Sequence, residues 1–218
     1  MLNILVTGGT GFVSGRIAAY FTALGHHVSV LNRGNSPQLP GVSLIRGDRR
    51  LCGHLLRGLR FDAVIDAVAY DAPDVETLLP ALEGSPVYVL ISSSAVYPET
   101  LPQPFTEAMP TGENRIWGAY GLGKVRAENA ALQLRPDSYI LRPPYLYGPG
   151  QNLYREPFVF DCARQARPFC LPGQGEMPLH FCHMDDLCRL IHILITRQPE
   201  SRILNVGDAA PVTVRRWV

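Results

Sequence analysis

The sequence predicts an α/β protein built on a doubly wound parallel sheet, with a partial, smaller domain at its C-terminal end. Short apolar runs alternate with segments of helical periodicity through the first two thirds of the 218 residues, which is the rhythm of strand–helix–strand units. The apolar runs are continuous, as in strands that helices cover on both faces. One link between a strand and a helix is a glycine-rich turn. These three observations favour a Rossmann-type sheet.

The predicted elements follow one another along the first 150 residues. Apolar runs predict strands at residues 2–6, 28–31, 42–45, 62–67, 87–91 and 139–141. Helical periodicity predicts helices at residues 12–24, 74–82 and 119–134. A long loop at residues 98–115 is rich in proline and threonine, and loops of this length inside a compact domain usually serve function.

The alternation becomes less regular beyond Gly150. Helices are predicted at residues 156–164 and 184–196, a strand at 203–206, and Thr213 is placed to cap a further helix. We therefore expect residues 1–150 to form the sheet domain, rejoined by about 178–197. Residues 151–177 and 198–218 then form the partial second domain.

Composition narrows the classes of partner. The formal net charge is +1, so no overall field would attract nucleic acid or an acidic membrane surface. The apolar N-terminal run is short and has no basic flank, and no run reaches the ~18 apolar residues of a membrane span. We expect a cytoplasmic protein with no membrane partner.

The cysteines predict neither a disulfide framework nor a metal site. There are 5 of them, and no two form a CxxC pair. Cys182, His183, Cys188 and His192 lie close together in the sequence, but their spacing matches no zinc pattern.

The glycine-rich turn is Thr7-Gly8-Gly9-Thr10-Gly11-Phe12, directly between the first strand and the first helix. Glycines let the backbone approach a pyrophosphate closely, and the helix N-terminus then offers it free amides. The turn predicts a dinucleotide site. Its candidate binding residues are Gly8, Gly11, Phe12 and Val13.

Charge at the second strand indicates which dinucleotide is bound. NAD-binding units usually carry an Asp or Glu about 20 residues past the glycines to hold the ribose hydroxyls. This chain has Asn32 followed by Arg33 there, and no carboxylate before Asp48. A guanidinium grips a ribose phosphate well. NADP is therefore favoured over NAD, although Asn32 leaves NAD open.

Tyr120 and Lys124 stand four residues apart on one predicted helix, and therefore on one face of it. Lys124 is the only lysine among 20 basic residues. A nearby ammonium stabilises a phenolate and can also bond a ribose hydroxyl. The pair predicts proton transfer coupled to hydride transfer, with both residues also close to the cofactor.

The segment VTGGTGFVSG resembles the TGxxGxxG fingerprint of the extended short-chain dehydrogenase/reductase superfamily, the group of NAD-dependent epimerases and dehydratases. SSSAVY at residues 92–97 is similar to the SSxxVY segment, which implies Ser93 as the hydroxyl that bonds the substrate oxygen. The segments LRPPYLYGP and HMDDL resemble further motifs. The resemblance implies cofactor contacts from Asp48, Arg49, Ala67, Val68 and Ala69.

Two positions depart from the pattern. Ser14 stands at the third glycine, and Tyr145 stands where sugar-nucleotide enzymes carry an asparagine that contacts the substrate. The chain also ends earlier than the family usually does, so the smaller, substrate-facing domain is incomplete. We expect this form to bind dinucleotide and to turn over substrate poorly.

The resemblance implies an NAD(P)-dependent oxidoreductase or epimerase/dehydratase that acts on a sugar-like or other hydroxyl-bearing small molecule through a keto intermediate. Its catalytic residues would be Ser93, Tyr120 and Lys124. The alternative is a non-catalytic cofactor-sensing or RNA-binding protein on the same fold, since the sequence also resembles chloroplast stem-loop-binding proteins, which act on RNA. A homodimer is left open.

Overall fold

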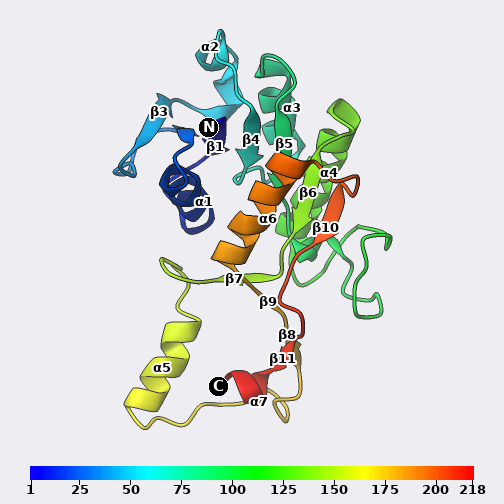
Figure 1. Cartoon of the computed structure of the whole chain (residues 1–218). Helices are drawn as coiled ribbons and strands as arrows, with labels where there is room; N and C mark the ends of the chain where they lie inside the picture. Colours follow the sequence, from blue (N-terminus) through cyan, green and yellow to red (C-terminus); the bar gives the residue numbers. More distant parts are fainter.

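A computed structural model describes all residues, 1–218. Seven parallel strands form one sheet in the order β10-β6-β5-β4-β1-β2-β3 (Figure 1). This arrangement confirms the predicted doubly wound sheet. The strands span Asn3–Thr7 (β1), His27–Asn32 (β2), Val42–Arg46 (β3), Ala63–Asp66 (β4), Val87–Ile91 (β5), Tyr139–Arg142 (β6) and Ile203–Asn205 (β10).

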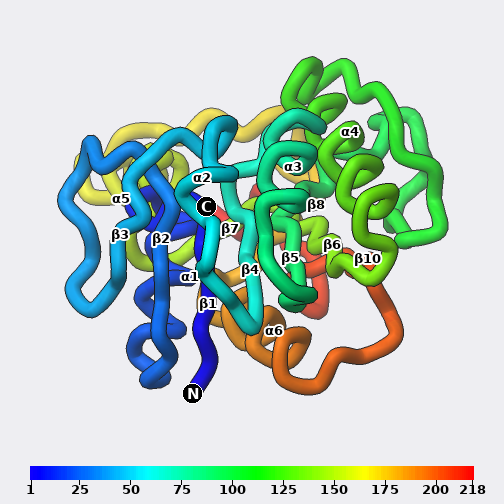
Figure 2. Tube along the Cα trace, turned by 90° about the horizontal axis from the view of Figure 1, so that it is seen from above, coloured from blue at the N-terminus to red at the C-terminus, as the bar shows by residue number.

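Helices cover both faces of the sheet, as Figure 2 shows from above. One face carries α1 (Phe12–Ala23) and α6 (Met184–Arg197), and the other carries α2 (Gly53–Leu56), α3 (Ala72–Leu78) and α4 (Gly118–Leu134). Side chains of β1 alternate between the two cores: Ile4 and Val6 pack on the α1 side, and Leu5 packs on the α3 side. Both faces are buried, which is why the strands are continuously apolar.

A smaller lobe hangs below the carboxyl edge of the sheet in Figure 1. It holds α5 (Glu156–Arg164), α7 (Val214–Trp217) and an antiparallel pair of β8 (Pro178–Leu179) with β11 (Val212–Thr213). A parallel pair, β7 (Tyr145–Tyr147) with β9 (Phe181–His183), leads into it. The proposed division into two domains stays a prediction, with one change. Strand β10 pairs with β6 in the large sheet, although we had placed residues 198–218 in the smaller domain.

Helix α6 returns the chain to the sheet domain, whereas β8, which also falls within the predicted range 178–197, pairs with β11 in the smaller lobe. The first turn of α6 is tied to α1 because Arg16 donates two hydrogen bonds to Asp185, at 2.8 and 2.6 Å. His183 caps the helix by accepting a hydrogen bond from the Asp185 amide at 3.2 Å. The HMDDL segment is therefore a structural joint between the two halves of the chain.

None of the helices is long and apolar enough to cross a membrane. All five cysteines are free, and four of them are buried. The structure contains no group of three or more His, Cys, Asp or Glu side chains suited to a metal ion.

Candidate functional site

The glycine turn has a backbone that side chains would block. Gly8 and Gly9 both have φ of +90°, and a Cβ on Gly9 would lie 2.5 Å from Val30. Gly11 caps α1, and its carbonyl accepts the first helical hydrogen bond from Gly15 at 2.7 Å. The first turn of α1 carries no acidic side chain, so its free amides and positive dipole end suit a phosphate. The turn therefore fits the pyrophosphate of a dinucleotide.

Ser14 occupies the third glycine position without disturbing this turn. It is buried, and its hydroxyl would lie only 2.8 Å from a Cβ on Gly8. The serine side chain fits because Gly8 has no side chain. The departure from the glycine pattern is thus accommodated inside the turn itself.

The side chain of Asn32, at the end of β2, makes hydrogen bonds within the protein. Its amide donates to the Gly8 carbonyl at 2.6 Å, and its oxygen accepts from the Gly34 amide at 2.8 Å. The Arg33 side chain is exposed and makes no hydrogen bond or ion pair. Arg46 is the register partner of Asn32 on β3, and it donates to the Arg33 carbonyl at 3.3 Å. Two guanidinium groups without carboxylate partners therefore lie at this end of the site, and the sequence indicated only one of them.

Asp48 and Arg49 follow β3. Asp48 accepts a hydrogen bond from the Arg50 amide at 2.9 Å. Arg49 makes a bidentate pair with Asp66, at 2.8 and 2.7 Å, and donates to the Asp74 carbonyl at 2.8 Å. The charge of Arg49 is therefore neutralised by Asp66 within the protein.

Asp66 is fully buried at the end of β4. Burial acts to raise the pKa of its carboxyl, but the charge and hydrogen bonds of Arg49, with hydrogen bonds from Thr7 and Tyr88, lower the pKa below its usual value. Asp66 thus stays ionised and orders the carboxyl edge of the sheet. The only signal for this pair in the sequence is a polar residue at the end of an apolar run.

The segment Ala67-Val68-Ala69 lies against the glycine turn. The Thr7 hydroxyl accepts hydrogen bonds from the amides of Ala67 and Val68, at 3.0 and 3.3 Å. A Cβ on Gly8 would lie 3.0 Å from the Val68 side chain. The structure therefore brings together the residues predicted from the first and fourth strands.

Lys124 is the buried cation of the site, with 3% of its surface exposed. Its ammonium donates to the carbonyls of Ala69 and Ile91, at 2.7 and 2.8 Å. Burial lowers the pKa of Lys124 to about 8, so it is mostly charged at neutral pH. An ammonium has three donors, and two are used here. The third N–H is left for a cofactor or substrate oxygen.

Tyr120 lies one helical turn before Lys124, and the ammonium is 6.0 Å from the centre of its ring. The side chain of Tyr120 is 41% exposed. Burial of the phenol group raises its pKa, and the nearby Ser93 hydroxyl opposes this rise. Ser93 itself caps a short 3₁₀ turn by accepting a hydrogen bond from the Ala95 amide at 3.2 Å. The three predicted catalytic residues therefore meet at the carboxyl edge of the sheet.

A buried polar chain behind these residues escaped the sequence analysis. Glu128 forms an ion pair with Arg142 at 2.6 Å and accepts from the Ser92 hydroxyl at 2.5 Å. Arg142 also donates to the Tyr97 hydroxyl at 2.8 Å, which donates to Asn205 at 2.8 Å. This network of buried polar side chains ties α4 to the end of β5, to β6 and to β10. The spacing of Glu128 was an available signal, because it falls four residues after Lys124 on the same helical face.

Comparison with known proteins agrees with this geometry. The doubly wound parallel sheet, with a glycine turn after its first strand, is the fold of dinucleotide-binding α/β proteins. The model of the NAD dependent epimerase/dehydratase family matches residues 4–207. The chain belongs to this family.

Individual relatives are distant. Over 98% of its length the chain is 30% identical to a 2'-dehydrokanamycin reductase of Streptomyces kanamyceticus, covering 64% of that protein. It is 28% identical, over 97% of its length, to the chloroplast stem-loop binding protein of 41 kDa b of Arabidopsis thaliana, covering 60% of it. The chain thus spans about three fifths of the length of these relatives.

Solved structures share the fold. A putative epimerase from Burkholderia cenocepacia superposes with a TM-score of 0.83 at 22% identity, over 98% of this chain and 77% of that one. A dTDP-glucose 4,6-dehydratase from Bacillus anthracis, solved in complex with NAD, gives a TM-score of 0.79 at 20% identity, over 99% and 78%.

Proposed function

We propose that the protein is an NAD(P)-dependent oxidoreductase or epimerase/dehydratase that acts on a hydroxyl-bearing small molecule through a keto intermediate. The observation that carries the proposal is the buried ammonium of Lys124, which lies 6.0 Å from the Tyr120 ring and donates to the carbonyls of Ala69 and Ile91. Family membership and the reductase among the relatives support it.

Tyr120 would act first as a proton donor. Because burial raises the pKa of this phenol above its usual value of 10, the side chain is protonated at neutral pH. It can give its proton to a carbonyl oxygen as that oxygen gains negative charge. The charged Lys124 then stabilises the phenolate that remains. In the reverse direction, the same phenolate would take the proton from a substrate hydroxyl.

Ser93 would hold the substrate oxygen. Its Oγ accepts one hydrogen bond from the Ala95 amide, and its own hydrogen can be donated to that oxygen. The bound nicotinamide would supply or accept the hydride. The protein would also hold the dinucleotide, with the glycine turn at its phosphates and Lys124 at a ribose hydroxyl.

NADP is the cofactor that the charges favour. Arg33 has no carboxylate partner, and Arg46 lies beside it on the neighbouring strand. Two guanidinium groups suit a ribose phosphate. Asn32 is held by Gly8 and Gly34, so no acidic side chain stands ready for the hydroxyl pair of NAD.

Two measurements test the proposed function. NADPH and NADH are titrated into the protein, and turnover of a panel of ketones and sugar nucleotides is compared between the unmodified protein and Tyr120→Phe. We expect cofactor binding in both proteins and turnover that depends on Tyr120. Absence of cofactor binding, or equal turnover in both proteins, would contradict the proposal.

RNA binding is the second candidate, favoured by the relative that is named for stem-loop binding. The near-neutral charge of this chain offers little attraction for phosphates. Titration with a stem-loop RNA at two salt concentrations separates the two functions. RNA binding that weakens steeply with salt, in a protein that binds no dinucleotide, would favour this candidate.

A further inference from the structure

Aromatic side chains form a continuous line from the candidate catalytic tyrosine into the smaller lobe. Ring centres lie 6.3 Å apart between Tyr120 and Trp117, 6.3 Å between Trp117 and Tyr145, and 6.0 Å between Tyr145 and Phe181. Trp217 stacks on Phe181 at 5.9 Å. We call these five residues the aromatic line. It joins α4, β7, β9 and α7, which are far apart in sequence.

The near end of the line is open to solvent. Trp117 and Tyr120 are each 41% exposed, and Tyr145 is 39% exposed. Large aromatic rings that stand side by side with open faces mark a binding surface. Because Tyr120 is one of these rings, a molecule lying on them would meet its phenol hydroxyl.

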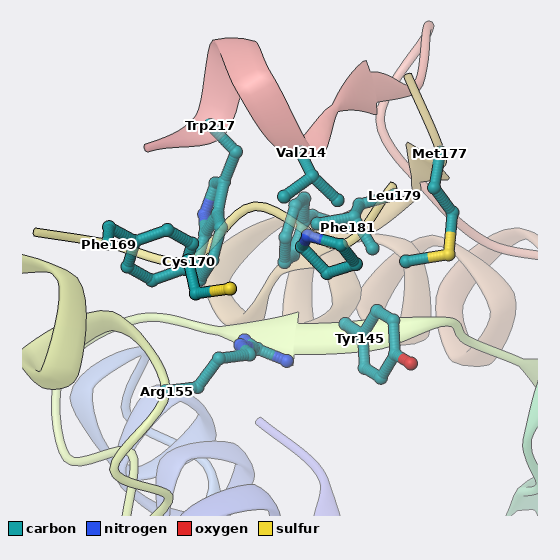
Figure 3. Close-up of a pocket in the computed structure, with 10 residues that line it drawn as sticks. Tyr145, Arg155, Phe169, Cys170, Met177, Leu179, Phe181, Val214 and Trp217 are labelled. Carbon is teal, nitrogen blue, oxygen red and sulfur yellow. The ribbon is translucent and has the colours of Figure 1, made fainter. Parts of the chain in front are cut away.

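The far end of the line opens into a cavity of about 270 Å³, shown in Figure 3. Its wall is mostly apolar, with Tyr145 and Arg155 on one side and Trp217 and Val214 on the other. Arg155 is the only charged residue in this wall. The cavity therefore suits an apolar group.

Arg155 is not free to hold a phosphate. Its guanidinium pairs with Glu156 and donates to the Leu146 carbonyl at 3.1 Å. It also lies 5.1 Å from the ring centres of both Tyr145 and Phe181. A diphosphate bound here would need a guanidinium or ammonium that the protein has not already neutralised.

We infer that the aromatic line and its cavity bind the body of a substrate whose reacting carbonyl or hydroxyl group is attached to an aromatic or fused apolar ring system. This inference rests on the proposed function for the reaction itself, and it names the class of substrate. Tyr145 and Trp117 are the residues that select it. A nucleoside-diphosphate sugar is disfavoured by the same surface.

The two tryptophans of the chain give a direct measurement, since Trp117 and Trp217 stand near the two ends of the line. The probes are α-tetralone, a cyclic ketone fused to a benzene ring, and UDP-glucose. We expect α-tetralone to quench tryptophan fluorescence and to bind at least tenfold more tightly than UDP-glucose. Failure of α-tetralone to bind, or equal or tighter binding of UDP-glucose, overturns the inference.

Substitutions at Tyr145 locate the effect. Tyr145→Leu removes the aromatic ring but keeps an apolar side chain, and should weaken α-tetralone binding about tenfold. Tyr145→Phe should keep the affinity. The matched control is Tyr154→Leu, because Tyr154 is also exposed but lies outside the line. Equal affinity in Tyr145→Leu and the unmodified protein, or equal loss in Tyr154→Leu, overturns the inference.

Tyr120→Phe keeps the failure of this inference separate from failure of the proposed function. The variant keeps the ring and loses the hydroxyl, so it should still bind α-tetralone while losing reduction of it by NADPH. If the unmodified protein binds α-tetralone and dinucleotide but Tyr120→Phe reduces ketones equally well, the proposed reaction mechanism fails and the binding surface stands. If ketones of other classes are reduced but α-tetralone is not bound, the inference about the binding surface fails and the proposed reaction mechanism stands.

Discussion

The backbone of Gly123 lies so close to the carbonyl oxygen of Tyr70 that a Cβ on this glycine would be 2.3 Å from that oxygen. A Cβ on Gly121, two residues earlier, would lie 2.5 Å from the carbonyl oxygen of Ala95. Helix α4 can therefore lie against the loops that follow β4 and β5. This approach allows Lys124 to reach the carbonyls of Ala69 and Ile91.

The first prediction follows from this contact. Gly123→Ala should push α4 away from the loop, because a backbone carbonyl cannot swing aside as a side chain does. We expect a loss of roughly 1–3 kcal/mol in the free energy of unfolding and weaker NADPH binding, measured by urea denaturation and calorimetric titration. The control is Gly53→Ala, where a Cβ would meet nothing within 4 Å. Unchanged stability and affinity in Gly123→Ala would show that the helix is not held in this way.

The sheet and its main helices could be predicted because each depends on a local signal. Buried strands such as β4 read as continuous apolar runs, and the turn at Gly8 breaks the first strand visibly. Helix α2 and the β7–β9 pair were missed, since four residues or fewer are too short for a period to be recognised.

The contacts of the site were harder to predict than its residues. Tyr120 and Lys124 share one helix, so their spacing indicated them. The pairing of Arg46 with the Arg33 loop depends on strand register, and the pairing of Glu128 with Arg142 joins two distant elements. No local pattern carries that information.

The second prediction tests the need for a lysine. Lys124→Arg keeps the charge, but the larger planar fork cannot occupy a place that holds an ammonium between the Ala69 and Ile91 carbonyls. We expect turnover to fall by about two orders of magnitude or more, as it should for Tyr120→Phe. Steady-state kinetics would measure the loss, and full activity in Lys124→Arg would contradict the argument.

The third prediction concerns pH. Burial lowers the pKa of Lys124 from 10.5 to about 8, so between these values the unfolded chain binds a proton that the folded chain does not. Stability must then rise as pH increases from about 8 to above 10. The difference in pKa corresponds to roughly 3 kcal/mol. Urea denaturation at pH 7.5 and 10.5 should show this gain in the unmodified protein relative to Lys124→Met, and parallel changes in both proteins would refute it.

The last prediction separates the two cofactors. Arg33 and Arg46 should each hold the ribose phosphate of NADP, which NAD lacks, so Arg33→Ala and Arg46→Ala should weaken NADPH binding by on the order of 1–3 kcal/mol and leave NADH binding unchanged. Calorimetric titration of both cofactors measures this. Arg57→Ala is the control, because Arg57 is also exposed and makes no hydrogen bond or ion pair. Equal affinity of the unmodified protein for the two cofactors would exclude a phosphate site here. A parallel loss of NADPH and NADH in Arg46→Ala would mean that this side chain supports the Arg33 loop and does not bind the phosphate.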